Sequence, residues 1–413
     1  MSNPTTTAGG RFSPDRRIVW YLSLLGFFAI FSTTISKNPV LPLFSQAIGA
    51  NDAVIGLIAA VSPLAGILFS FPVGVLSDHL GRRRLLITSG VVFLSAPLFY
   101  LFITDPLWLI PVRFFHGTAT AILVPVVSAV IAERFPENKG AMLGQFSSAT
   151  LMGRTIAPLI GGIIISYFVF YPGLIAYRIV YLVAAFAAVP VLIMTIMYRE
   201  NRSPPFNLPV ISRFHESFVT FFSLAGLRAT ALVDMATYFA FGAFETFLPL
   251  LLASQGITAF QTGIIFAVQV LIIAGTKPSF GRLADRFDKR VQIAAGLIIV
   301  GCSVAAIPLV SSFTLFLLVS ATLGLGMSLS TVATSAYVAD IALKEQIGAS
   351  MGALSSTMDV GHSAGPLVTG IIITAVGYTI GFFVSFLLAI AVTAAFVLSV
   401  RDKEESLGES NTS

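Results

Sequence analysis

The residues of this chain best suited to chemistry are the ionisable side chains that interrupt long apolar runs. Three carboxylates lie well inside such runs, Asp234, Glu245 and Asp359. Asp234, Tyr238, Phe241 and Glu245 follow one another at spacings of four, three and four residues, which places them on one stripe of a helix. A carboxylate that alternates between water and a closed cavity can bind and release a proton. These residues are therefore candidates for proton coupling or substrate binding, with a static ion pair as the alternative role for each carboxylate.

Two arginines and two histidines also interrupt apolar runs. Arg113 and His116 are one helical turn apart, and Asp359 and His362 have the same spacing. A charged side chain at the centre of a bilayer costs about 3 kcal/mol on insertion scales unless it faces a polar cavity or a partner. We therefore expect Arg113 and His116 to face the protein interior, with snorkelling of Arg113 to the outer surface as the alternative. Arg154, in the middle of its run, needs an anion from the protein or from a substrate.

The composition places the chain in a membrane. Only 10% of its 413 residues are charged and 56% are hydrophobic, whereas a soluble domain has about 25% charged residues. The sequence contains no GxxxxGK[ST] run for ATP, its four histidines are scattered, and its single cysteine, Cys302, cannot form an internal disulfide. We therefore expect neither an enzyme nor a cofactor or metal site, and a proton gradient as the energy source.

Twelve apolar segments are long enough to span a bilayer as helices. They cover residues 18–37, 53–74, 85–104, 107–132, 141–168 and 175–198, and then 223–252, 260–280, 291–311, 313–340, 347–376 and 378–400. A polar interval with Pro204, Pro205 and Pro209 separates the two sets. The expected fold class is an all-α membrane protein with twelve transmembrane helices in two six-helix bundles.

This pattern divides the chain into five parts. They are an N-terminal tail at 1–17, a first bundle at 18–198, a linker with a short surface helix at 199–222, a second bundle at 223–400 and a C-terminal tail at 401–413. The tails and the loops on their side of the membrane hold most of the 24 Lys and Arg residues. Because basic loops stay cytoplasmic, we expect both termini in the cytoplasm and a location in the plasma membrane. The expected partners are a small-molecule substrate, protons and lipid, without nucleic acid, and the protein is expected to be a monomer.

An internal repeat relates the two halves. At an offset of 208 positions, small and proline residues of the first half match identical residues of the second. The matches pair Gly140, Gly144, Ser147, Ser148, Gly153, Pro158 and Gly162 with Gly348, Gly352, Ser355, Ser356, Gly361, Pro366 and Gly370. Such self-similarity is typical of transporters built from duplicated bundles, which are then pseudo-symmetric.

Two segments between the second and third spans of each half resemble a family signature. Gly74 to Arg83 resembles the signature loop of the major facilitator superfamily, and Gly281 to Arg290 resembles its weaker second copy, with Asp288 in place of the second glycine. The matching residues are Gly74, Asp78, Gly81, Arg82 and Arg83, and Gly281, Asp285 and Arg290. The resemblance implies that these loops latch a cytoplasmic gate, where an aspartate can bind the positive N-terminus of a neighbouring helix. The alternative is that the basic residues only set the topology.

The fourth and fifth expected spans carry further resemblances to this family. The run from Arg113 to Gly117 resembles its arginine-containing fourth-helix motif. The run from Gly153 to Gly162 resembles the fifth-helix motif associated with antiporters, with Ala157 in place of a glycine. The motif residues and their counterparts in the second half are Gly153, Pro158, Gly161 and Gly162, and Gly361, Gly365 and Pro366. The resemblance implies a tightly packed bend that seals the central cavity, and packing alone is the alternative.

Three functions agree with these features. The first, which we expect, is proton-coupled export by antiport and alternating access of hydrophobic or amphipathic compounds, cationic ones included, as in multidrug efflux. The second is proton-coupled uptake of a nutrient or organic anion held by Arg113 and Arg154. The third is a membrane receptor without transport, against which the buried charges argue. Among the carboxylates, Asp234 is the favoured proton carrier.

Overall fold

The computed structural model describes residues 14–199, 221–342 and 347–410, nearly all of them helical. Within these ranges, side chains are described outside 14–16, 71–72, 74–80, 347–349 and 400–410. The surface helix expected in the linker lies largely outside the described residues.

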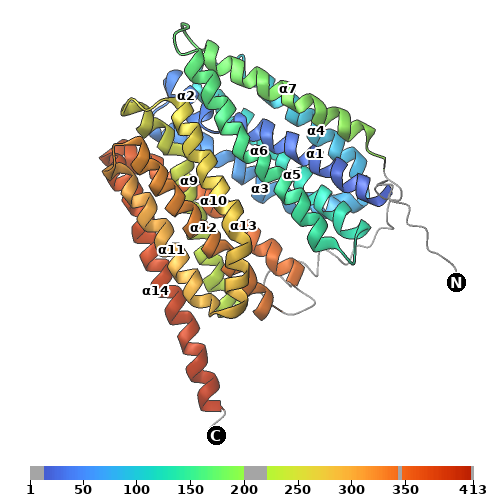
Figure 1. Ribbon diagram of the computed structural model, residues 1–413, viewed down its shortest axis with the longest axis vertical. Helices are drawn as coiled ribbons and strands as arrows, with labels where there is room; N and C mark the ends of the chain where they lie inside the picture. Colours follow the sequence, from blue (N-terminus) through green and yellow to red (C-terminus); the bar gives the residue numbers. More distant parts are fainter. Residues whose placement is uncertain (1–13, 200–220, 343–346, 411–413) are drawn as a thin grey trace, which may run out of the picture.

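Twelve long helices run through the described part of the chain (Figure 1). Those of the first half are α1 (Pro14–Ile35), α3 (Asp52–Leu80), α4 (Arg82–Tyr100), α5 (Leu109–Arg134), α6 (Lys139–Tyr167) and α7 (Ile175–Met197). Those of the second half are α9 (Ala225–Ser254), α10 (Ala259–Arg286), α11 (Lys289–Ala306), α12 (Phe313–Ile341), α13 (Ile347–Val376) and α14 (Tyr378–Ser410). A short helix, α2 (Val40–Ala47), lies between α1 and α3.

Each long helix coincides with one of the twelve apolar segments, which confirms the expected all-helical membrane fold. Eleven helices of the described ranges are long and apolar enough to cross a bilayer. The remaining helix, α4, has 19 residues and begins with Arg82, Arg83 and Arg84. Their charges lower its hydropathy without shortening it, so α4 completes the set.

The helices pack as two bundles. In the first bundle α1 packs against α6 and α7, α3 packs against α5, and α4 packs against α5 and α7. In the second bundle α9 packs against α13 and α14, α10 against α12, and α11 against α12 and α14. The two bundles meet mainly through two pairs of helices, α3 with α13 and α6 with α10. Figure 1 shows that the two bundles lie together near α2 and diverge toward the end of the molecule where the N and C termini are marked.

The bundles touch through backbone at one end, which we call the sealed end. A Cβ atom added to Gly56 of α3 would overlap the carbonyl oxygen of Pro366 in α13, and one added to Gly263 of α10 would overlap the carbonyl oxygen of Pro158 in α6. Pro158 and Pro366 are equivalent positions of the repeat. Only glycine allows helices to approach this closely, so the repeat builds the same contact twice.

Hydrogen bonds between the bundles reinforce the sealed end. The Ala53 N–H donates to the Thr374 hydroxyl at 2.9 Å, and the Phe260 N–H donates to the Ser166 hydroxyl at 3.0 Å. The Tyr378 hydroxyl donates to a carboxylate oxygen of Asp52, also at 3.0 Å.

The bundles are apart at the opposite end, where α7 ends and α9 begins and which we call the open end (Figure 1). Here a Cβ atom added to certain glycines of α6, α10 and α13 would meet no atom of the described residues within 4 Å. These glycines are Gly140, Gly144, Gly275, Gly281 and Gly352. The space between the bundles therefore opens at this end.

The fifth-helix motif and its counterpart also pack within their own bundles. A Cβ atom at Gly153 would lie 2.7 Å from the carbonyl oxygen of Phe27 in α1. One at Gly361 would overlap the carbonyl oxygen of Met235 in α9, and Met235 is the repeat equivalent of Phe27. A Cβ atom at Gly365 would overlap the Phe239 carbonyl oxygen in the same way. These glycines thus allow the close packing of α6 on α1 and of α13 on α9.

Two expectations about local structure are wrong. The segments from Gly74 to Leu80 and from Gly281 to Arg286 do not lie in loops, because α3 continues through Leu80 and α10 through Arg286. The apolar window marks only the part of a helix within lipid, and polar residues can prolong the helix into water. The turn falls at Gly81, whose φ of 81° is a backbone conformation that favours glycine. The second error is the omission of α2, which is too short to span a membrane.

Candidate substrate and proton site

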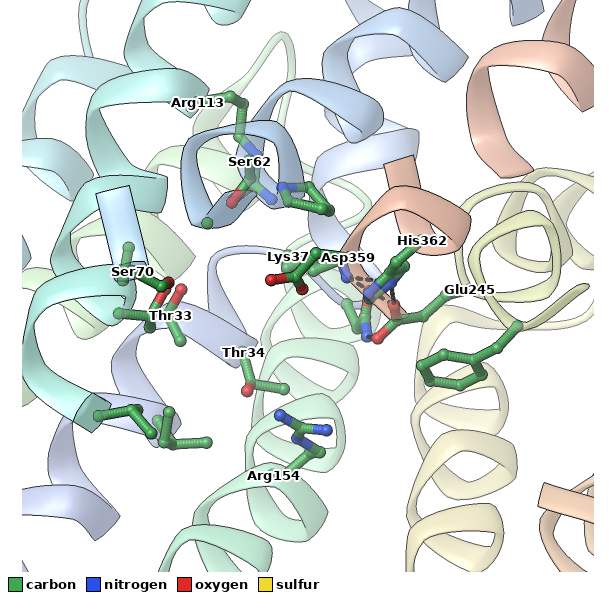
Figure 2. Close-up of a pocket in the computed structure, with 18 residues that line it drawn as sticks. Thr33, Thr34, Lys37, Ser62, Ser70, Arg113, Arg154, Glu245, Asp359 and His362 are labelled. Atoms are coloured by element: carbon green, nitrogen blue, oxygen red, sulfur yellow. Dashed lines mark hydrogen bonds and ion pairs between the residues drawn. The ribbon is translucent and has the colours of Figure 1, made fainter. Parts of the chain in front are cut away.

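A cavity of about 280 Å³ lies between the bundles. Its walls come from α1, α3, α5 and α6 of the first bundle and from α9 and α13 of the second. The lining is about equally polar and apolar, and Figure 2 shows several of its polar side chains. Its hydroxyl and charged residues are Thr33, Thr34, Lys37, Ser62, Ser70, Arg113, Thr120, Arg154, Glu245, Asp359 and His362. Phe241 is the aromatic ring of the lining.

A charged cluster joins the two bundles inside this cavity. The Lys37 ammonium lies 2.5 Å from Oε2 of Glu245, and the Asn38 amide donates to Oε1 of Glu245 at 2.5 Å. Nε2 of His362 lies 2.9 Å from the same Oε2 and 3.3 Å from the Lys37 ammonium. The dashed lines in Figure 2 mark this Lys37–Glu245–His362 cluster.

The cluster stands next to the sealed end. Lys37 and Asn38 follow the last residue of α1, Ile35, and precede α2. His362 precedes Pro366 by one helical turn on α13. The Glu245 side chain is buried, so its ionised form depends on Lys37 and on the hydrogen bonds that it accepts. The cluster therefore closes the cavity where the bundles converge.

The repeat relates the members of this site to one another. Lys37 and Glu245 are 208 positions apart, the same offset that aligns the two halves, so they are equivalent residues that meet across the pseudo-symmetry axis. Arg154 and His362 are also separated by 208 positions. Two equivalent pairs of positions thus supply four of the ionisable groups of the cavity.

Arg154 and Asp359 face the cavity apart from the cluster. Among the interactions of the described residues, none is a hydrogen bond or ion pair of Arg154 or Asp359. Figure 2 shows Arg154 apart from the cluster, near Thr34, with no dashed line to any of the residues drawn. The Asp359 carboxylate lies against α3, where a Cβ atom at Gly66 would be 3.0 Å from its Oδ2. The anion expected beside Arg154 is thus not a described carboxylate of the protein.

Arg113 lies in the cavity wall. Its side chain is only 2% exposed, so it does not snorkel to the surface. Its Nε has no hydrogen-bond partner among the described residues. Together with Lys37 and Arg154, Arg113 makes three basic residues against two acidic ones in the lining.

Three of the candidate residues lie outside the cavity lining. His116 is buried between Phe93 and Tyr100, with ring centroids 6.4 and 6.0 Å away, and is not among the residues that line the cavity. Asp234 is buried within the second bundle, where it accepts a hydrogen bond from Thr334 of α12 at 2.8 Å.

Tyr238 is the third, and it packs its ring near Phe241 and His362. The stripe of α9 therefore reaches the cavity only through Phe241 and Glu245. Asp234 and Tyr238 are not among the lining residues, because α9 also packs against α11, α12, α13 and α14. A helix surrounded by neighbours has no single face for the substrate.

The residues of the signature segments lie at the open end. Arg82 is buried and forms an ion pair with Glu133 of its own bundle, and Arg83 donates to the carbonyl oxygen of Ile196 at 3.1 Å. Asp285 is exposed. The side chain of Asp78 lies outside the described ones, so its latch with a neighbouring helix stays a prediction.

Sequence reasoning overlooked Lys37 as a site residue. It stands at the end of the first apolar segment, 18–37, where a basic residue is not unusual. The repeat contained the missing signal, because an offset of 208 places Lys37 opposite Glu245. Within the described ranges, no group of three His, Cys, Asp or Glu residues is arranged to hold a metal ion.

Comparison with known proteins agrees with this architecture. The profile of the Major Facilitator Superfamily matches residues 22–251 and 230–412. An uncharacterized MFS-type transporter of Methanocaldococcus jannaschii is 26% identical, over 85% of this chain and 92% of its own. A multi-drug resistance efflux pump PmrA homolog of Lactococcus lactis is 24% identical, over 92% of both chains.

Solved structures share the fold. A bacterial homolog of the human lysosomal transporter Spinster, in an inward-facing and unoccupied conformation, superposes with a TM-score of 0.73 at 15% identity. It covers 94% of this chain and 96% of its own. A POT family transporter gives a TM-score of 0.77, also at 15% identity and with the same coverage.

Proposed function

Since the chain belongs to the major facilitator superfamily and is a secondary transporter rather than an enzyme, we propose that it is a proton-coupled antiporter. In this proposal it exports small amphipathic compounds that carry an anionic group. The observation on which the proposal rests is the Lys37–Glu245 pair, which bridges the bundles beside the sealed end. Opening that end for alternating access separates the pair.

Separation of the pair supplies the coupling. A carboxylate parted from its ammonium in a low-dielectric cavity takes up a proton, whereas an adjacent ammonium favours the ionised form. Glu245 would bind a proton while the sealed end is open and lose it when Lys37 returns on closure. If the open end faces the cytoplasm, as the basic loops predict, each cycle moves a proton inward.

When substrate moves outward, a group other than a proton must compensate for breaking the Lys37–Glu245 pair. Breaking a buried ion pair without compensation costs about 3–5 kcal/mol. A substrate anion in the cavity competes with Glu245 for Lys37 and so compensates for that loss. Proton and substrate then use the same pair on opposite steps, which is the requirement for antiport.

The cavity lining supports an anionic and partly polar substrate. Arg154 faces the cavity without a described partner, and an arginine binds carboxylate or phosphonate groups with two parallel hydrogen bonds. Hydroxyl groups of Thr33, Thr34, Ser62 and Ser70 supply further polar contacts. A strongly hydrophobic cation fits this lining less well.

The proposed direction of transport rests on a sequence motif and on relatives. The Gly153 to Gly162 motif resembles that of antiporters. Relatives of low identity include the efflux pump PmrA homolog of Lactococcus lactis and the multidrug resistance protein 2 of Bacillus subtilis. Proton-coupled uptake of an organic anion is the second candidate, because Arg113 and Arg154 serve either direction. We also propose that residues 18–198 and 223–400 are the two moving bundles, that both termini are cytoplasmic, and that Asp78 and Asp285 belong to the gate at the open end.

A probe screen followed by transport in liposomes tests the proposal. Thermal shifts at pH 6 and pH 8 would compare an aromatic carboxylate, salicylate, with a lipophilic cation, tetraphenylphosphonium. We expect carboxylates to stabilise the protein. Arg154→Gln should weaken their affinity by about tenfold, since a charge-assisted hydrogen bond is worth about 1.5–3 kcal/mol.

A stabilising carboxylate is then loaded into proteoliposomes. In molecules whose open end faces the lumen, a more acidic outer solution should drive the carboxylate out through the sealed end. Stabilisation by the cation alone, unaffected by Arg154→Gln, would overturn the substrate class. Movement of proton and substrate in the same direction would favour the uptake alternative.

A further inference from the structure

A second cavity, of about 360 Å³, lies at the open end of the first bundle. Residues from three separate segments surround it. They are Arg17, Ile18 and Tyr21 of α1, Arg134 at the end of α5, and Met197, Tyr198 and Arg199 at and beyond the end of α7. Its volume falls within the range of small-molecule sites, roughly 300–1,000 Å³.

The charge of this cavity calls for an anion. Three arginines line it, and no acidic residue belongs to its described lining. A cavity lined by three guanidinium groups attracts anions and repels cations. Guanidinium groups donate charge-assisted hydrogen bonds to the oxygens of a phosphate group.

The surface next to the cavity suits an acyl chain. Met197 lines the cavity and is 66% exposed, and Ile193 and Ile196 beside it on α7 are about half exposed. On the adjoining α1, Trp20 and Leu24 are likewise exposed. Tryptophan and tyrosine are typical of the boundary between headgroups and hydrocarbon. A phosphate group in the cavity would therefore stand at the head of an apolar strip facing the membrane.

We propose that this cavity binds the headgroup of an anionic phospholipid, with the acyl chains lying along α7 and α1. The apolar strip favours a lipid over free phosphate, although both share the chemistry of the phosphate group. The site is separate from the central cavity and does not depend on the proposed direction of transport or substrate.

The two tryptophans of the chain provide a direct probe. Trp108 lies in the single-turn helix that precedes α5. It is therefore next to the start of α5, whereas Arg134 is the last residue of α5. The Trp108→Phe variant leaves Trp20, one turn from Arg17, as the single fluorophore. In nanodiscs, lipids brominated on their acyl chains quench Trp20 when they occupy the strip. Phosphatidylglycerol and phosphatidylcholine with identical brominated chains are compared at equal mole fractions.

We expect phosphatidylglycerol to quench Trp20 at a several-fold lower mole fraction than phosphatidylcholine. The variant Arg17→Gln/Arg134→Gln/Arg199→Gln should lose this preference, because each arginine near anionic lipid contributes about fivefold in affinity. The matched control is Arg228→Gln/Arg282→Gln/Arg286→Gln, which removes three exposed arginines from the second bundle at the same end. The control should keep the preference.

Three outcomes would overturn the proposal. One is equal quenching by both lipids in the Trp108→Phe protein. Another is equal loss of the preference in the pocket variant and in the control, which would indicate unspecific attraction. The third is removal of the preference by inorganic phosphate but not by chloride at the same ionic strength, which would assign the cavity to free phosphate. Arg17→Lys/Arg134→Lys/Arg199→Lys keeps the charges and should retain most of the preference, which separates binding from folding defects.

Discussion

The two ends of this molecule are built from one repeated sequence and yet are packed in opposite ways. At the sealed end, Gly56 and Gly263 lie against proline carbonyl oxygens of the other bundle. At the open end, Gly144 and its repeat equivalent Gly352 face empty space. The sealed end also has the Lys37–Glu245 pair beside it. The difference indicates that the sealed end combines close backbone contact, which depends on shape, with a charged pair, which a proton or substrate can switch.

The largest effect is expected from Glu245→Gln. Glutamine keeps the shape of the side chain and the bond from Asn38 but cannot ionise, so proton-driven transport should fall at least tenfold in liposomes. Substrate counterflow without a gradient should persist, because a neutral side chain resembles the protonated state. Asp234→Asn is the matched control, since Asp234 lies outside the cavity beside Thr334, and more than half of the activity should remain. Full proton-driven accumulation by Glu245→Gln would remove Glu245 from the coupling mechanism.

A smaller effect is expected when the sealed end is overpacked. Gly263→Val adds atoms where the Pro158 carbonyl oxygen stands, and forced overpacking costs about 1–3 kcal/mol. The equilibrium should shift toward opening of the sealed end by roughly 5-fold to 150-fold. A cysteine at Thr34, in a Cys302→Ser background, reports the shift through impermeant thiol reagents applied from each side.

Gly352→Val at the open end is the control for this experiment, because its added atoms meet empty space. It should leave labelling of the cysteine from the sealed side unchanged. Equal labelling patterns in the two valine variants would show that the backbone contact does not hold this end closed.

The smallest effect is expected from Asp78→Asn in the proposed gate. The two bundles are already apart at the open end in this state. Loss of a latch there should slow turnover severalfold but keep the thermal unfolding temperature within about 2 °C of the wild-type value. Transport and unfolding are measured on the same preparation. A wild-type turnover rate with unchanged accessibility of the open end would contradict the latch assignment, and a large fall in unfolding temperature would assign Asp78 a structural role.

Much of the fold was predictable because the bilayer imposes its own length on apolar segments. The twelve helices were visible as runs of about 20 residues, and α4 was found despite its three arginines because its apolar run continues to Tyr100. The helix ends were less predictable. Polar residues such as those from Gly74 to Leu80 carry no hydrophobic signal, whether they form helix or loop.

The site was predicted in part. Arg113, Arg154, Glu245, Asp359 and His362 line the cavity, as expected of charges that must avoid lipid. His116 and Asp234 do not line it, although their positions in apolar runs were equally unusual. Burial away from lipid was the inference that the sequence supported. Burial in the cavity, as opposed to burial between helices of one bundle, depended on which neighbour each helix face meets.

The sequence by itself determined the helical membrane fold, the duplication and the scarcity of buried charges, because hydrophobic length and repeat spacing are properties of the chain alone. Only the tertiary structure decided which charges meet. Lys37 and Glu245 are 208 residues apart and on different bundles, and their 2.5 Å contact exists because the sealed end brings the ends of α1 and α9 together. An ion pair across such a distance in sequence has no local signal, since its energy depends on a separation that helix packing alone establishes.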